Sequence, residues 1–311
     1  MSQSQPLSQP LSRPVPLPRR QAFSGLWVPI VSPFRDGRVD LAAAQRLVEG
    51  LVQSKCRGVI VCGTTGEAAT MSLAERRALL DAVTSAARGR LRVAIGVGGN
   101  DTRAVAAEAA GWSDTGVDAL LISAPAYTRP SQAGIRAHFE AILAAGDRPI
   151  IVYNVPYRTG VDIDVETVRA LAEHPRIVAI KESTGERIDR LFDLIHDTDI
   201  AVLCGEDKLA LTAACLGAHG AILAAANVRP DLYVRVAALA DEGRIADARA
   251  LFARLMPLIR LLYAEPNPSV IKAALAHQGL IADELRLPMV PASAVTRERL
   301  IPVLEDVLRL D

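Results

Sequence analysis

From residue 25 onward, the sequence alternates eight times between a short apolar run and a longer amphipathic segment. Short apolar runs that end in turn residues are typical of strands buried on both faces. The segments between them carry apolar residues three and four positions apart, which predicts helices. Because parallel strands need crossover helices, this alternation predicts a parallel sheet. The expected strands are 25–31, 58–62, 91–96, 117–122, 149–153, 177–181, 200–204 and 220–224.

Eight strand–helix units suit closure of the sheet, so we predict the α/β class and a (β/α)8 TIM barrel. An open doubly wound sheet is the alternative, but it usually carries G-x-G-x-x-G after its first strand. This chain has SPFR at residues 32–35 instead. Two helix starts are marked by capping residues, Asp40 at one and the pair Ser72 and Glu75 at the next.

Three parts are expected along the 311 residues. Residues 1–21 are rich in Pro, Ser and Gln, lack the continuous apolar segment of a secretory signal, and predict a disordered tail. Residues 22–244 form the barrel, a length typical of this fold. Residues 245–311 predict a three-helix C-terminal appendage, packed on the barrel or on a neighbouring subunit, with helices at 246–263, 268–277 and 295–310.

Composition excludes several classes of partner. Lys plus Arg and Asp plus Glu both number 35, so no single-signed field for nucleic acid or acidic lipid is expected. The sequence contains no uninterrupted run of 18 apolar residues, so we expect no membrane span. The five histidines show no metal-ligand spacing, and we expect neither a metal nor a cofactor. The four cysteines, which form no C-x-x-C pair, are predicted to be reduced and buried in a cytoplasmic protein: Cys56, Cys62, Cys204 and Cys215.

The sixth predicted strand ends in a lysine, Lys181, and the loop that follows is polar. In a TIM barrel the carboxyl ends of the strands form the catalytic face. Desolvation there disfavours the ammonium form, and a neutral amine can attack a ketone to form a Schiff base. The alternative is a lysine that reaches solvent or pairs with Glu182, because most lysines are solvated.

Hydroxyl groups follow the second and fifth predicted strands. Thr64 and Thr65 lie between glycines, where side-chain and backbone donors can bind a small anion. Tyr153 ends the fifth strand and Arg158 follows it, which would pair a proton carrier with a carboxylate clamp. The alternatives are an ordinary polar turn and a core tyrosine with a surface arginine. The loop after the fourth strand adds a further tyrosine, Tyr127.

A lysine, tyrosines, threonines and an arginine on one rim suit Schiff-base aldol chemistry on an α-keto acid. The amine condenses with the ketone, and the iminium accepts electrons while the adjacent methyl group loses a proton. The resulting enamine is the nucleophile, and a tyrosine can carry the protons.

Three blocks identify a family: GTTGE at 63–67, YNVP at 153–156 and IKE at 180–182. From about Phe23 to its C-terminus the chain resembles the dihydrodipicolinate synthase and N-acetylneuraminate lyase family of pyruvate-dependent class I aldolases. YNVPYRTG, AEPNP and LRLPM most resemble the branch that condenses pyruvate with aspartate-4-semialdehyde on the route to diaminopimelate and lysine. The resemblance therefore implies two small-molecule substrates, pyruvate and an aldehyde.

The resemblance also implies roles for single residues. Lys181 would form the Schiff base, and Tyr153 would donate and accept protons through Thr64 and through Tyr127 of the partner subunit. A shared Tyr127 implies at least a homodimer, and the family is commonly a homotetramer. Four further residues would bind the substrates: Thr65 for the pyruvate carboxylate, Ile222 and Gly205 in the wall, and Arg158 for the carboxylate of the semialdehyde.

The chain departs from the lysine-inhibited members of the family. Those members carry histidines at the positions of Leu73 and Arg76, a glutamate at Ala104 and a tyrosine at Ala126, and of this set only Asn100 remains. Leucine and alanine cannot hydrogen-bond an amino acid, and an arginine repels its ammonium group. We therefore expect inhibition by lysine to be weak or absent.

Two rival functions remain open from the sequence. A paralogous aldolase or dehydratase would use a sugar acid or a hydroxy-keto acid, but Arg158 argues against it because sugars need hydroxyl-binding residues. Tyr157, in place of a small residue beside that arginine, narrows or alters the aldehyde pocket. A non-catalytic sensor of a keto acid is the second rival, and the intact set of Lys181, Tyr153 and Thr64 argues against it.

Overall fold

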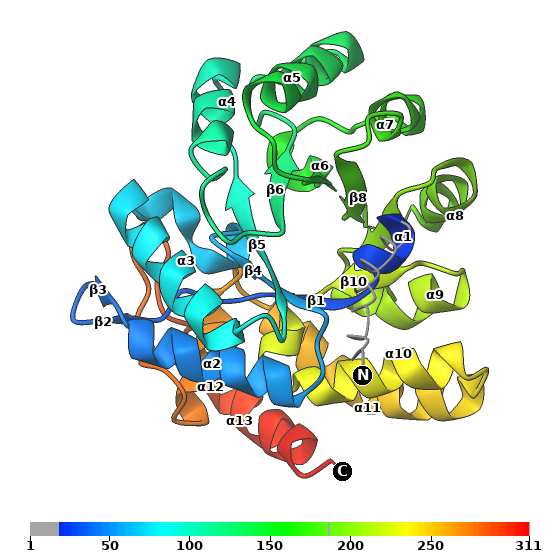
Figure 1. Ribbon diagram of the computed structural model, residues 1–311. Helices are drawn as coiled ribbons and strands as arrows, with labels where there is room; N and C mark the ends of the chain where they lie inside the picture. The colour runs from blue at the N-terminus through cyan, green and yellow to red at the C-terminus, as the bar shows by residue number, and fades with distance from the viewer. Residues whose placement is uncertain (1–18, 186, 311) are drawn as a thin grey trace, which may run out of the picture.

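The computed structural model describes residues 19–185 and 187–310. Eight parallel strands close into a barrel in the order β1-β10-β9-β8-β7-β6-β5-β4, which confirms the predicted TIM barrel (Figure 1). Every strand boundary lies within two residues of its predicted position. The strands are β1 (Gly25–Pro29), β4 (Gly58–Val61), β5 (Arg92–Val97), β6 (Ala119–Ser123), β7 (Ile150–Asn154), β8 (Ile177–Glu182), β9 (Ala201–Cys204) and β10 (Gly220–Ile222).

Helices surround the barrel, and their starts follow the capping residues. Asp40 accepts a hydrogen bond from the backbone N–H of Ala43, and Ser72 and Glu75 form the predicted capping box. The crossover helices are α2 (Leu41–Gln53), α3 (Leu73–Ala87), α4 (Thr102–Ala110), α5 (Gln132–Ala145), α7 (Val165–Ala172), α8 (Ile188–Asp197), α9 (Ala210–Cys215) and α10 (Pro230–Asp241).

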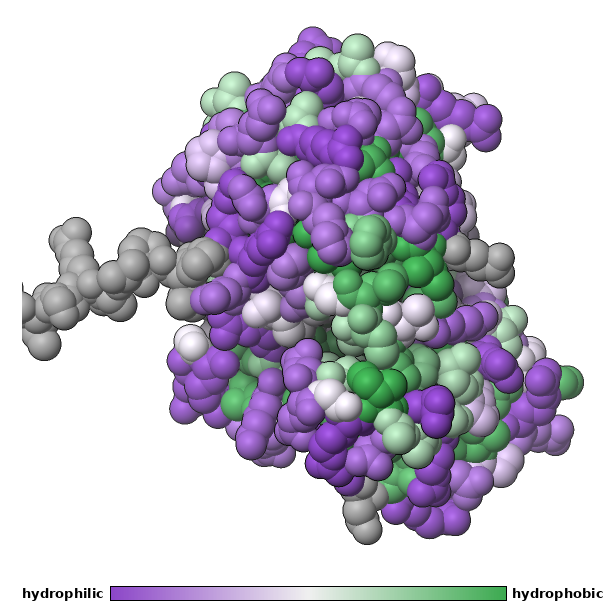
Figure 2. Space-filling view, turned by 90° about the vertical axis from the view of Figure 1, so that its right-hand side faces the viewer, coloured by the Kyte–Doolittle hydropathy of each residue, from purple (hydrophilic) through white to green (hydrophobic). Residues whose placement is uncertain are grey.

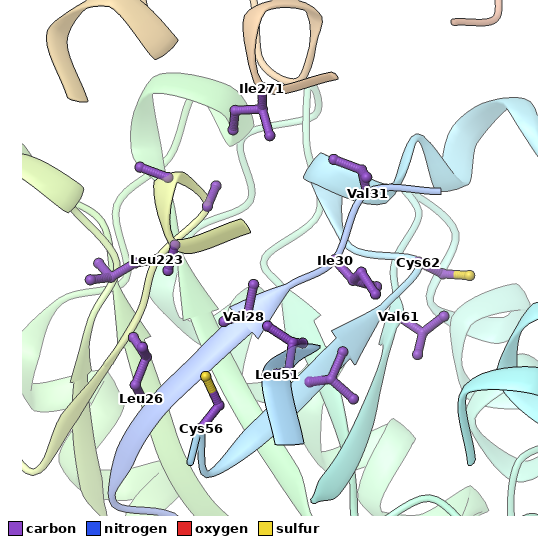
Figure 3. Packing of buried hydrophobic residues seen from close by; sticks show 14 of the residues in the cluster. Leu26, Val28, Ile30, Val31, Leu51, Cys56, Val61, Cys62, Leu223 and Ile271 are labelled. Atoms are coloured by element: carbon purple, nitrogen blue, oxygen red, sulfur yellow. The ribbon is translucent and has the colours of Figure 1, made fainter. Parts of the chain in front are cut away.

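Alternating side chains of each strand supply two separate cores. Leu26, Val28 and Ile30 point from the first strand segment toward the surrounding helices (Figure 3). Trp27 points the other way and fills the barrel interior, where its indole N–H donates to the carbonyl of Phe23 (3.1 Å). This two-residue period follows from the strand geometry, and it places neighbouring residues in different environments.

The three-helix C-terminal appendage is present as α11 (Ile245–Leu262), α12 (Ser269–His277) and α13 (Ala294–Leu308). Figure 1 shows these helices beneath the barrel, beside α2 and α10. Helix α11 packs on α10 and α13, so the appendage is part of the same hydrophobic core as the barrel wall.

Some details differ from the sequence predictions. A two-stranded antiparallel hairpin, β2 (Phe34–Arg35) with β3 (Arg38–Val39), precedes the first crossover helix and is too short to show a strand period. Residues 19–21, placed in the tail by the sequence, belong to helix α1 (Arg19–Ala22), and residues 1–18 lie outside the described part. Cys215 is exposed rather than buried, whereas the other three cysteines are buried as predicted.

In the described part of the chain, no helix combines the length and the apolar character needed to cross a membrane.

Candidate active site

Lys181 and Tyr153 lie side by side at the carboxyl end of the barrel. Strand β8 pairs with β7 in a register that sets Lys181 opposite Tyr153. Both side chains are directed inward and are 8% and 7% exposed. The Nζ of Lys181 lies 4.3 Å from the centroid of the Tyr153 ring. The alternative of a solvated lysine is therefore wrong.

Glu182, the other partner considered for Lys181, faces the opposite side of β8 and contacts different groups. Its carboxylate accepts hydrogen bonds from Asn154 (2.8 Å) and forms an ion pair with the Nε of Arg190 (3.1 Å). Burial raises the pKa of Glu182 to about 7, although Arg190 and Asn154 act in the opposite direction. Because Asn154 is the neighbour of Tyr153, this buried network ties together the strand ends that carry the two candidate catalytic residues.

Gly205 must be a glycine because the side chain of Lys181 crosses it. A Cβ added there would lie 2.9 Å from the Cε of Lys181 and 1.9 Å from the Oγ of Ser183. Any larger residue would push the amine out of its position. Gly205 therefore forms part of the wall of the chamber.

A small chamber beside Lys181 brings together seven of the eight predicted site residues. Pro29, Leu121, Tyr157, Ala224, Tyr263 and Asn267 also line it. The seven are Thr64, Thr65, Tyr153, Arg158, Lys181, Gly205 and Ile222.

Thr64 and Thr65 belong to the short 3-10 helix η1 (Thr64–Gly66), which follows β4 directly. A hydrogen bond from the hydroxyl of Ser32 to the carbonyl of Gly66 (2.6 Å) stabilises this turn. Thr65 is buried, whereas Thr64 is exposed. Side-chain hydroxyls and a fixed turn at the end of a strand can bind a small carboxylate.

Arg158 lies at the outer end of the chamber, on the short helix α6 (Pro156–Thr159). Its guanidinium lies 5.4 Å from the centroid of the Tyr157 ring. The residue also lines an adjoining open cleft of about 470 Å³, together with Glu206, Lys208 and Glu265. An exposed arginine beside an open cleft can bind the carboxylate of a substrate that enters from solvent.

The structure adds a buried acid and a partly exposed tyrosine bonded to it, which the sequence did not predict. Asp207 accepts a hydrogen bond from the hydroxyl of Tyr263 (2.5 Å) and another from the backbone N–H of Ala225 (2.8 Å). Desolvation raises the pKa of both Asp207 and Tyr263. Tyr263 lines the chamber and comes from the C-terminal appendage, 56 positions from Asp207 in sequence. No local pattern could have indicated a contact over that separation.

Tyr127 is the one predicted site residue that does not line this chamber. It lies in the loop after β6, its side chain is 89% exposed, and its φ of 68° is left-handed. The backbone N–H of Tyr127 donates to the carbonyl of Thr159 (3.0 Å), which holds the loop beside the chamber. The tyrosine therefore projects from the protomer.

Across residues 19–185 and 187–310, no three His, Cys, Asp or Glu side chains are grouped so that they could hold a metal ion. A buried amine beside a phenol at the carboxyl end of a TIM barrel defines a Schiff-base-forming class I aldolase, which is a lyase.

Comparison with known proteins agrees with this class of enzyme. The sequence matches the dihydrodipicolinate synthetase family over residues 22–307, and the chain belongs to that family.

Individual relatives cover almost the whole chain. The 4-hydroxy-tetrahydrodipicolinate synthase of Fervidobacterium nodosum is 38% identical over 92% of this chain and 98% of the relative. The structure of the synthase of that name from Methylacidiphilum fumariolicum SolV is 37% identical, with a TM-score of 0.89 over 92% of this chain and 96% of its own. A structure described as a monomeric dihydrodipicolinate synthase variant is 34% identical, with a TM-score of 0.90 over 94% of this chain and 99% of its own.

Proposed function

We propose that this chain condenses pyruvate with aspartate-4-semialdehyde to form 4-hydroxy-tetrahydrodipicolinate, as the names of its relatives indicate. The observation that carries the proposal is the buried amine of Lys181, 4.3 Å from the Tyr153 ring and inside a chamber that also holds Thr65 and Arg158. Within this one cavity are an amine, a phenol, a threonine hydroxyl and a guanidinium for the condensation, and Tyr127 lies outside it.

The geometry supports an ordered reaction. The Nζ of Lys181 attacks the ketone carbon of pyruvate, and loss of water gives an iminium while Thr65 holds the carboxylate. Tyr153 removes a proton from the methyl group, and the enamine forms a carbon–carbon bond to the aldehyde held at Arg158. Tyr153, relayed by Thr64, returns the proton to the new alkoxide, and the amino group of the semialdehyde then displaces Lys181 as the ring closes.

We also propose that the chain assembles at least into a homodimer, and that the full assembly is a homotetramer. The support is the exposed Tyr127 beside the chamber, which would complete the proton relay of the partner subunit. Figure 2 shows an apolar area in the middle of the face on which Figure 1 places α8 and α9. Phe192 of α8 is 50% exposed, and contiguous apolar surface of this kind marks interfaces. A cytoplasmic location is also proposed, and the four free cysteines support it.

Two experiments test the reaction. Borohydride reduction in the presence of pyruvate is expected to attach the substrate to Lys181, as located by mass mapping. The same enzyme is then assayed with aspartate-4-semialdehyde and with a panel of sugar aldehydes and hydroxy-keto acids. Failure to trap pyruvate rules out an aldolase, whereas trapping without turnover of the semialdehyde assigns a different acceptor. Sedimentation velocity checks the assembly.

A further inference from the structure

Besides Tyr263, the C-terminal appendage contributes the side chain of Asn267 to the active-site chamber. This residue lies in the loop between α11 and α12 and lines the chamber beside Lys181. Its amide nitrogen donates a hydrogen bond to the Oγ1 of Thr65 (3.0 Å), 202 positions away in sequence. We infer that Asn267 is a positioning residue for pyruvate, because it sets the direction in which the Thr65 hydroxyl donates.

The number of hydrogen bonds that a hydroxyl group can form limits the partners of Thr65. A threonine hydroxyl has one hydrogen and two lone pairs. The amide of Asn267 occupies a lone pair of Thr65, so the single hydrogen of Thr65 remains available to an acceptor in the chamber. Thr65 is only 3% exposed, and thus that acceptor is a bound substrate rather than bulk water. The carboxylate of pyruvate is an acceptor of this kind, and this step rests on the proposed function.

The loop of Thr65 and the appendage are fastened together at a second place. Glu67, which follows the turn, has a left-handed backbone with φ of 49° and is 5% exposed. Its carboxylate forms an ion pair with the fully buried Lys272 of α12 and accepts the backbone N–H of Arg286 (3.1 Å). The contact with Lys272 holds α12 against the turn, and the contact with Arg286 holds the loop between α12 and α13 there. Helix α12 begins two residues after Asn267.

The carbonyl oxygen of the Asn267 amide is the remaining feature that points to a role in binding. It is buried and has no hydrogen-bond partner among residues 19–185 and 187–310. A buried acceptor without a partner is costly and calls for an explanation, of which a role at a functional site is one. The amide is therefore held in place by its one bond to Thr65 and by packing.

A double-mutant cycle tests whether Asn267 acts through Thr65. Asn267→Ala is expected to raise the KM for pyruvate about tenfold, because the Thr65 hydroxyl is no longer directed toward the charged carboxylate, with kcat changed less than about threefold. Thr65→Val is expected to raise KM at least as much. In the Thr65→Val background, Asn267→Ala should then change KM less than about twofold. Equal effects of Asn267→Ala in both backgrounds would overturn the inference.

A second substitution tests which group donates in the hydrogen bond between Asn267 and Thr65. Aspartate can only accept, so Asn267→Asp turns the Thr65 hydroxyl away from the substrate and adds a negative charge near its carboxylate. The KM for pyruvate should therefore rise more in Asn267→Asp than in Asn267→Ala. A KM near the wild-type value in Asn267→Asp would show that Thr65 donates to Asn267, and the inference would fail.

Controls separate this inference from the proposed function. Gln278→Ala removes an amide at the opposite end of α12, where it donates only to the backbone carbonyl of Ala274 (3.3 Å), and should leave KM unchanged. Borohydride trapping at saturating pyruvate should still label Lys181 in every variant. If the wild-type enzyme traps no pyruvate, the proposed function fails, whereas normal trapping with an unchanged KM in Asn267→Ala refutes the positioning role alone.

Discussion

Two lysines are buried in the described part of this protein, and each lies against the face of an aromatic ring. Lys181 lies 4.3 Å from the centroid of the Tyr153 ring, and Lys272 lies 4.2 Å from that of Phe34. Lys272 forms an ion pair with Glu67 and donates to the carbonyl of Glu284 (2.8 Å). Within residues 19–185 and 187–310, Lys181 has no carboxylate within 4 Å, and its amine opens on a cavity.

The difference shows that burial alone does not make a lysine a nucleophile. Desolvation lowers the pKa of Lys272, but Glu67 acts against it, and the amine has no free approach for a substrate. The charge of Lys272 is used to join the appendage to the loop of Thr65. Lys181 is freed for chemistry because its neighbour Glu182 is bound to Arg190 on the other face of β8.

The largest effect is expected for Lys181→Ala. Loss of the nucleophile should reduce turnover by at least about ten-thousandfold and abolish borohydride trapping. Thermal unfolding should be almost unchanged, because no ion pair is broken. Lys272→Ala serves as the matched buried lysine and should retain trapping. Pyruvate attached at another lysine in Lys181→Ala would contradict the assignment.

Tyr153→Phe makes the ring beside Lys181 resemble the Phe34 ring beside Lys272. The amine keeps its contact with an aromatic face but loses the proton carrier, so kcat should fall by about a hundredfold to ten-thousandfold. Imine formation at saturating pyruvate should persist in the mass spectrum. Unchanged turnover would remove Tyr153 from the proton relay.

Lys272→Met should act on stability rather than on the chemical step. It leaves the carboxylate of Glu67 buried without its ion-pair partner, which costs about 3–5 kcal/mol in the free energy of unfolding. Urea unfolding at a fixed protein concentration measures this loss. The double variant Glu67→Gln/Lys272→Met should recover most of it, and failure to recover would mean that the pair is not the cause.

The raised pKa of Glu182, which lies on the face of β8 opposite Lys181, predicts how stability depends on pH. Burial raises the pKa of Glu182 to about 7 from an ordinary 4.5, so the folded protein binds its proton more tightly than the unfolded chain. The stability from this proton is complete below pH 4.5 and is lost as the pH rises through 7. The free energy of unfolding, measured at several pH values, should decline less steeply with rising pH in Glu182→Gln than in the wild type. Parallel slopes would show that Glu182 is already ionised at pH 4.5.

The smallest effect is expected for added L-lysine. Arg76 is a further, half-buried cation with a carboxylate partner, because it contacts Glu108 (2.6 Å) and donates to the carbonyl of Gly96 (2.6 Å). Like Lys272, it is occupied by structural contacts. Millimolar L-lysine should therefore leave the initial rate unchanged, and a saturating decrease in rate would contradict this. A lysine-inhibited relative provides the positive control.

Local sequence alone determined the architecture. Strand and helix periods depend on residues a few positions apart, and Asp40 and Ser72 cap the helices that they precede. Parallel closure then brings the strand ends to one rim, which is why Lys181, Tyr153 and Thr65 could be placed together without coordinates. The side chain of Tyr127 is exposed, and its use by a partner subunit stays a prediction.

Only the tertiary structure decided which polar groups pair across the chain. The bonds from Asn267 to Thr65 and from Tyr263 to Asp207 join residues 202 and 56 positions apart, and the pairing of Glu182 with Arg190 depends on which face of β8 each side chain occupies. Periodicity carries no information about such contacts, because they arise from packing of the appendage and helices against strand ends. The same reason explains why the sequence could indicate Lys181 as the candidate Schiff-base lysine but not Lys272, which joins the appendage to the loop of Thr65.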